Sequence, residues 1–203
     1  MSNYNLTEKE GITLVKAARD IVTRYCLGSS QNIGEKFQQD FSFYAGVFVI
    51  LDNELRLRGC IGHPLPDKKL FDAVIAAAIA AATEDPRFPP VKYEELESIR
   101  FEVTVLTKPE TILASQPDEY LSKIKVGRDG LIVRNKFNAG LLLPQVPVEY
   151  GWNEREFLEH TCEKAGMEKD CWMDPDTIIQ KFQGIVFKEV CPKGPVIQEK
   201  LSE

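Results

Sequence analysis

A hairpin between two apolar segments constrains the fold of this chain more than any other feature. Residues 43–51 are rich in aromatic and β-branched side chains, Asp52-Asn53 is a turn signal, and residues 54–61 can return as the second strand. Hairpins of this kind join antiparallel strands. Mixed with helices, they favour an α+β architecture over the regular strand–helix alternation of a doubly wound sheet.

Two helices are well signalled on either side of this hairpin. Thr7 and Glu10 form a capping-box pattern ahead of an apolar stripe, and Gly28 ends that helix. Residues 29–40 then read as a loop. Asp67 can cap an alanine-rich helix that runs to about Thr83 and is apolar on more than one side.

The second half of the chain alternates between shorter elements. Residues 99–106 carry apolar side chains at odd positions and Arg100, Glu102 and Thr104 at even ones, which is typical of a half-buried strand. The other expected strands are 130–134, 140–143 and 185–190, and the other expected helices are 117–124, 153–166 and 176–182.

We expect one domain over residues 1–203 that consists of two unequal lobes. Each lobe is expected to be a mainly antiparallel sheet packed with helices. The smaller, inserted lobe is predicted to span residues 34–97. The larger lobe is predicted to combine residues 1–33 with residues 98–203.

Composition narrows the class of protein. The 203 residues include 25 Lys and Arg against 31 Asp and Glu, and this net charge of −6 argues against a general nucleic-acid binder. The most hydrophobic stretches, 47–51 and 73–82, are too short to span a bilayer, and residues 1–10 lack a signal-peptide pattern. The five cysteines are an odd, sparse set, which favours reduced thiols and a cytoplasmic location.

The segment from Arg56 to Gly62 is the first candidate site. In a regular strand alternate side chains share a face, so Arg56, Arg58 and Cys60 are predicted to point the same way. Two guanidinium groups would lower the pKa of the thiol and bind an anion. Gly59 and Gly62 would let a ligand or another backbone approach closely. The alternative is a buried Cys60 with arginines that are solvated or paired with acids.

Two other groupings are weaker. A Cys60–His63 pair would suit acyl transfer, but His63 follows a glycine and is expected to be a turn residue. A zinc site from His160 and the late cysteines is disfavoured, because His160 and Cys162 lie on nearly opposite faces of a helix. We therefore predict neither a metal nor a cofactor.

Six blocks occur in one order along the chain. They are Leu57–Gly62, the D-x-R-F-P-P loop at 85–90, Glu95-Leu96, the glycine-containing turn at 127–131, the L-P-[QE]-V-x-x-E-x-x-W block at 143–152, and the helix with its tryptophan at 157–172. In these blocks the chain resembles the AMME chromosomal region protein family, component A of AmmeMemoRadiSam systems. The resemblance implies an α+β fold of two unequal lobes, and it implies Memo-like and radical-SAM proteins as partners. The resemblance does not identify a reaction.

The combined prediction is a cleft between the lobes that binds or transforms a small anionic or carbonyl compound. Cys60 is the predicted nucleophile or covalent carrier. The predicted binding residues are Arg56, Arg58, Gly59, Gly62, Asp85, Arg87, Gln145 and Glu149. Asp85 and Arg87 can instead pair with each other. The alternative function is a non-catalytic module that docks a partner protein; a homodimer is possible, but no sequence stripe requires one.

Overall fold

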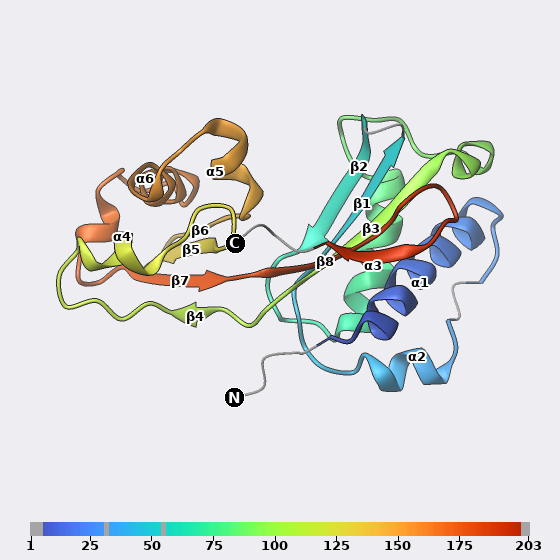
Figure 1. The fold of residues 1–203 in the computed structure, drawn as a ribbon, viewed down its shortest axis with the longest axis horizontal. Coiled ribbons are helices and arrows are strands. Elements are labelled where there is room, and N and C mark those ends of the chain that lie inside the picture. The colour runs from blue at the N-terminus through green and yellow to red at the C-terminus, as the bar shows by residue number, and fades with distance from the viewer. Residues whose placement is uncertain (1–5, 31–32, 54–55, 200–203) are drawn as a thin grey trace. The chain divides into compact units, whose positions relative to one another are not determined.

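The computed structural model describes residues 6–30, 33–53 and 56–199 (Figure 1). These residues form two compact units. The first runs to Thr107 and resumes at Ile185, and the second is Lys108–Gly184. The α+β class is confirmed, because each unit contains an antiparallel sheet and helices.

The sheet of the first unit has five strands. Its order is β2 (Arg56–His63), β1 (Val47–Asn53), β3 (Ile99–Leu106), β8 (Gly184–Glu189) and β9 (Val196–Glu199). β1 pairs antiparallel with both β2 and β3, and β8 pairs antiparallel with β9. The predicted β1–β2 hairpin is present, although the residues that connect its strands lie outside the described residues. Among the described strands β2 lies at the edge of the sheet, so one side of its backbone pairs with none of them.

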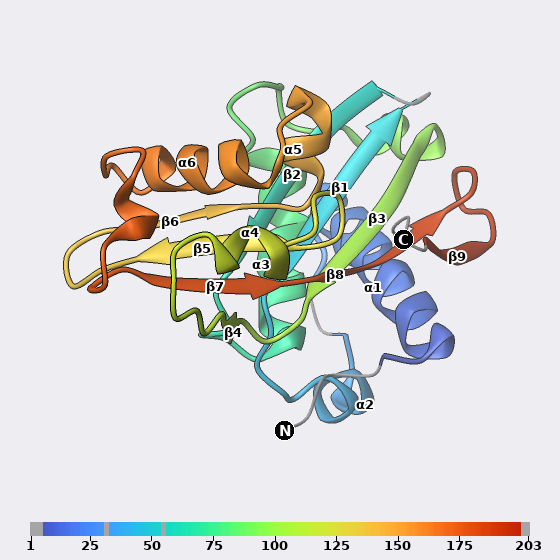
Figure 2. The same cartoon turned by 60° about the vertical axis from the view of Figure 1, so that its left-hand side comes forward.

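Two long helices pack against this sheet, α1 (Glu8–Cys26) and α3 (Leu70–Thr83) (Figures 1 and 2). The predicted capping box at Thr7 and Glu10 begins α1. α3 begins after its cap residue Lys69, two residues later than the Asp67 cap predicted. The apolar side of the sheet meets both helices in one core, which includes Leu14, Ile21, Val49, Leu51, Val74, Ala78, Phe101 and Val103.

The second unit has a four-stranded antiparallel sheet. Its order is β4 (Glu110–Thr111), β7 (Ile178–Phe182), β5 (Gly130–Arg134) and β6 (Ala139–Leu142). Its helices are α4 (Glu119–Lys123), α5 (Gln145–Tyr150), α6 (Glu154–Lys164) and the 3-10 turn η2 (Cys171–Met173). An Asn153–Glu156 capping box begins α6, which packs on β5 and β6.

The structure divides the chain differently from the predicted lobes. Every residue of β1 pairs with a residue of β3, so hydrogen bonding joins the segments before and after residue 97 into one sheet. β8 then joins the same sheet beside β3. The observed second unit is a segment between β3 and β8, rather than an insertion over residues 34–97.

Two local predictions also differ from the structure. Residues 29–40 were expected as a loop but contain α2 (Glu35–Asp40), whose Phe37 is buried in the core. Residues 176–182 were expected as a helix, but Ile178–Phe182 is β7, which lies between β4 and β5. The two neighbouring strands outweigh a short segment's helical pattern.

The cysteines are not all reduced thiols. Cys162 and Cys171 form a disulfide that joins α6 to η2, whereas Cys26, Cys60 and Cys191 are free.

His160 hydrogen-bonds Glu163 and stacks on Trp152 at 3.9 Å between ring centroids. Within the described ranges, no cluster of three His, Cys, Asp or Glu side chains could hold a metal ion. The same ranges contain no helix long and apolar enough to cross a membrane.

Candidate functional site

A β-bulge reorganises the candidate strand. Asp52 lies opposite Leu57, but Leu51 lies opposite Gly59, so Arg58 is an extra residue in β2. The extra residue reverses the alternation of side chains along β2, and Arg56 and Cys60 therefore belong to opposite faces of the sheet. The structure does not bring Arg56, Arg58 and Cys60 together on one face.

Arg58 forms an ion pair with a glutamate of the first unit. Its guanidinium donates two hydrogen bonds, of 2.9 and 3.1 Å, to the carboxylate of Glu95 in η1 (Tyr93–Glu97). The Arg58 side chain is only 13% exposed, and Arg56 is exposed. The alternative considered for these arginines, solvation or pairing with acids, fits their environment in the structure.

Both glycines of the motif make room for protein atoms. A Cβ on Gly59 would lie 2.1 Å from the carbonyl oxygen of Ala81, so glycine lets β2 approach the backbone of α3. A Cβ on Gly62 would lie 2.4 Å from the ring of Phe48. Close packing of the fold therefore accounts for Gly59 and Gly62 without a ligand.

Asp85, directly after α3, organises the surroundings of Cys60. Its Oδ2 accepts a hydrogen bond of 2.9 Å from the backbone N–H of Cys60. Because β2 lies at the edge of the sheet, the carboxylate takes the hydrogen bond that a neighbouring strand would otherwise accept. Its carboxylate also accepts from the backbone N–H, Nε and Nη2 of Arg87, at 3.1, 2.9 and 2.7 Å. The hydrogen bonds from Arg87 are the main reason that the pKa of Asp85 lies far below its ordinary range.

Arg87 is the cation that lies beside the thiol. Its side chain is 55% exposed, while that of Asp85 is 2% exposed, so the buried carboxylate holds a guanidinium that solvent can reach. Burial raises the pKa of the Cys60 thiol, although Arg87 acts to lower it, and Asp85 and Glu102 also raise it. The largest of these effects, burial, acts against the thiolate that the sequence suggested.

Glu102 is a site residue that the sequence did not single out. Ile50 of β1 lies opposite Cys60 on one side and opposite Glu102 on the other, so all three side chains share one face of the sheet. The backbones of β2 and β3 are two strand spacings apart, or roughly 9–10 Å. Burial raises the pKa of the Glu102 carboxyl. The available signal was its polar position in the alternating segment 99–106.

Gln145 and Glu149 belong to α5 of the second unit. They are four residues apart, share one side of the helix and are exposed. The prediction that they contribute to the Cys60 site stays a prediction.

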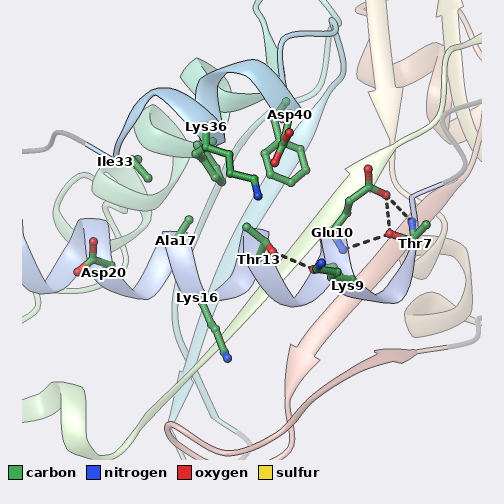
Figure 3. Close-up of a pocket in the computed structure, with 12 residues that line it drawn as sticks. Thr7, Lys9, Glu10, Thr13, Lys16, Ala17, Asp20, Ile33, Lys36 and Asp40 are labelled. Atoms are coloured by element: carbon green, nitrogen blue, oxygen red, sulfur yellow. Dashed lines mark hydrogen bonds between the residues drawn. The ribbon is translucent and has the colours of Figure 1, made fainter.

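A groove of about 760 Å³ lies between α1 and α2, away from the residues predicted for the site (Figure 3). Two of its acids have structural partners, because Glu10 caps α1 and Asp20 pairs with Arg24. The groove contains no cysteine or histidine. Cys60, with Asp85, Arg87 and Glu102, therefore remains the candidate site.

Comparison with known proteins agrees with the blocks in the sequence. The AMMECR1 family model matches residues 15–187. The chain belongs to the AMMECR1 family. The matched range includes Cys60, Asp85, Arg87 and Glu102 of this AMMECR1 domain.

AMMECR1 relatives from archaea match along almost their whole length. A protein of Methanopyrus kandleri is 50% identical, covering 98% of this chain and 97% of its own, and one of Thermococcus gammatolerans is 49% identical, covering 98% and 99%. The crystal structure of an uncharacterized protein from Pyrococcus horikoshii is similar with a TM-score of 0.85 at 46% identity, covering 98% of this chain and 100% of that one. These matches support the AMMECR1 fold across both units.

Proposed function

We propose that this protein binds and transforms a small carbonyl compound that carries a negative charge, using Cys60 and Arg87. The observation that carries the proposal is the double role of Asp85, which holds the backbone of Cys60 and the guanidinium of Arg87 at the same time. A thiol and an accessible cation are thereby fixed side by side. Arg87 takes the role of anion anchor that the sequence suggested for Arg56 and Arg58.

The chemistry of the site suits addition of the thiol to a carbonyl group. Sγ of Cys60 forms a bond to the carbonyl carbon, the carbon–oxygen π bond breaks, and the thiol proton passes to the oxygen. The product is a tetrahedral thiohemiacetal or thiohemiketal, and no further reactant is needed. Arg87 stabilises the negative charge that develops on the oxygen, and it binds a carboxylate on the same ligand.

A second proposal is a non-catalytic module that docks a Memo-like or radical-SAM protein. The raised pKa of Cys60 and the Arg58–Glu95 pair favour it, because both fit a motif that maintains backbone geometry. Gentle purification from the native host tests this proposal. Recovery of the protein together with such a partner supports docking, and repeated recovery alone counts against it.

Alkylation of Cys60 by iodoacetamide tests the first proposal, with the modified peptide identified by mass spectrometry. Pyruvate is the probe, because it joins a ketone to a carboxylate. We expect pyruvate to slow alkylation of Cys60 but not of the exposed Cys191. Arg87→Ala should weaken this protection about tenfold, since it removes a charge-assisted hydrogen bond. Arg155→Ala, which changes an exposed ion pair with Asp118, is the matched control. Equal protection in Arg87→Ala and the native protein would contradict the proposal.

A further inference from the structure

Glu102 is a half-buried carboxyl for which the described part of the chain shows no cationic partner. It accepts a long hydrogen bond, 3.4 Å, from the hydroxyl of Thr104 on the same strand. Two cations of the same sheet have other partners: Arg100 pairs with Asp52 at 2.6 Å, and Lys188 pairs with Glu199 at 2.5 Å. A half-buried carboxylate without a cation is costly to the folded protein, and a cationic ligand would lower that cost.

The charges around Glu102 do not compensate for it. Asp52 and Glu199 act to raise the pKa of Glu102, and Lys188 only partly opposes them. The ion pairs of Arg100 and Lys188 leave the Glu102 carboxyl without an ion pair of its own among the described residues. A cation from outside the protein would supply one.

The register of the sheet fixes the distance between the two ends of the site. Cys60 and Glu102 are both opposite Ile50, so a ligand that reaches from one to the other lies across β1. The two backbones are roughly 9–10 Å apart, so a short extended chain is enough to reach from one side chain to the other. An ammonium group at the far end of such a chain would lie within hydrogen-bonding distance of the Glu102 carboxylate.

We propose that the ligand of this site carries an amino group at the end remote from its carbonyl or carboxylate, and that Glu102 binds that amino group as its ammonium. This inference rests on the proposed function, because it assumes that the other end of the ligand lies at Cys60 and Arg87. It adds a substrate class: short amino-terminated carbonyl compounds or carboxylates. Arg87 binds the anionic end and Glu102 the cationic end.

Two probes of similar length test the inference by protection of Cys60 against iodoacetamide. They are 6-aminohexanoate and hexanoate, which differ in the terminal amine. We expect 6-aminohexanoate to protect Cys60 at an approximately tenfold lower concentration, because its ammonium gains a charge-assisted hydrogen bond. Equal protection by the two probes, or no protection by either while pyruvate protects, overturns the inference and leaves the proposed function standing. Failure of pyruvate as well overturns both.

Variants of Glu102 provide the second part of the test. Glu102→Gln should bring the ratio between the two probes close to one, while protection by pyruvate is retained. Glu110→Gln, an exposed carboxyl on β4, is the control and should keep the native ratio. Glu102→Asp shortens the side chain and should give an intermediate ratio, which covers the case in which Glu102→Gln fails to fold. A preference for the amine that persists in both Glu102 variants contradicts the inference.

Discussion

At the scale of single residues, the extra residue Arg58 decides what Cys60 faces. A strict alternation of side chains predicts two arginines beside the thiol, but the bulge at Arg58 directs that guanidinium to Glu95. The sequence does not show a bulge, because its position depends on how β2 pairs with β1. Cys60 was a candidate from the strand pattern, and Asp85 and Arg87 were found through the family blocks, yet their contacts with Cys60 required the fold.

The two arginines are expected to affect the thiol differently. Arg87→Ala should raise the pKa of Cys60, because the mutation removes the cation that lowers it. Arg58→Ala should leave that pKa unchanged and instead cost roughly 1 kcal/mol of stability, since it breaks a partly exposed ion pair. The measurement is the rate of Cys60 alkylation as a function of pH. A shift caused by Arg58→Ala and not by Arg87→Ala would reverse these assignments.

Asp85 should make stability depend on pH in acid. Its pKa is lowered in the folded protein, so its contribution is fully present above the pKa of an unfolded aspartate, about 4. The contribution is lost as pH falls below that value toward the folded pKa. Asp85→Asn should lower stability by about 1–2 kcal/mol near neutral pH, through weaker hydrogen bonds. It should also flatten the loss of stability below pH ~4.

Urea unfolding between pH 2 and pH 7 measures this effect. Asp118→Asn, at an exposed carboxyl, is the control. An Asp85→Asn protein that loses stability in acid as steeply as the native protein would show that Asp85 is not responsible.

At the scale of elements, a buried ion pair connects α1 to the sheet. Arg19 of α1 donates to the carboxylate of Glu189 on β8 and to the carbonyl oxygens of Leu96 and Ile99. Glu189 is buried and also accepts from the backbone N–H of Phe101 on β3. These contacts hold one helix and two strands in register.

Arg19→Met should therefore destabilise the protein by about 3–5 kcal/mol, because it leaves a carboxylate buried without its cation. The double variant Arg19→Met/Glu189→Gln should recover part of that loss, since the remaining polar group is neutral. Urea unfolding at pH 7 measures both values. A single variant within 1 kcal/mol of the native protein would mean that water replaces the arginine.

Elements with local signals were predicted well, and those without them were not. α1 and α6 each begin with a capping box that is visible in the sequence, at Thr7 and at Asn153. α2 and β7 are short, and their conformation depends on tertiary contacts, which a local pattern does not contain. The Cys162–Cys171 disulfide was missed for a similar reason, since cysteine counting does not give distances.

At the scale of the whole molecule, the division into units depends on pairings between distant segments. β8 returns after the entire second unit to lie beside β3, and β1 lies between β2 and β3. Hydrophobic patterns predict that each strand exists and which side is buried, but not which strand is its neighbour. The α+β class and two units were therefore predictable, while the boundary at residue 97 was not. The location of the candidate site on the first unit follows from those same pairings.

The Cys60 thiol is proposed to add to a carbonyl compound. Carbon-13 NMR of pyruvate labelled at its ketone carbon tests it most directly, because addition converts that carbon from trigonal to tetrahedral. We predict a new tetrahedral resonance with the native protein, and we predict that Cys60→Ser abolishes it while the fold is retained. The absence of that resonance from the native protein, or its persistence in Cys60→Ser, would contradict the account.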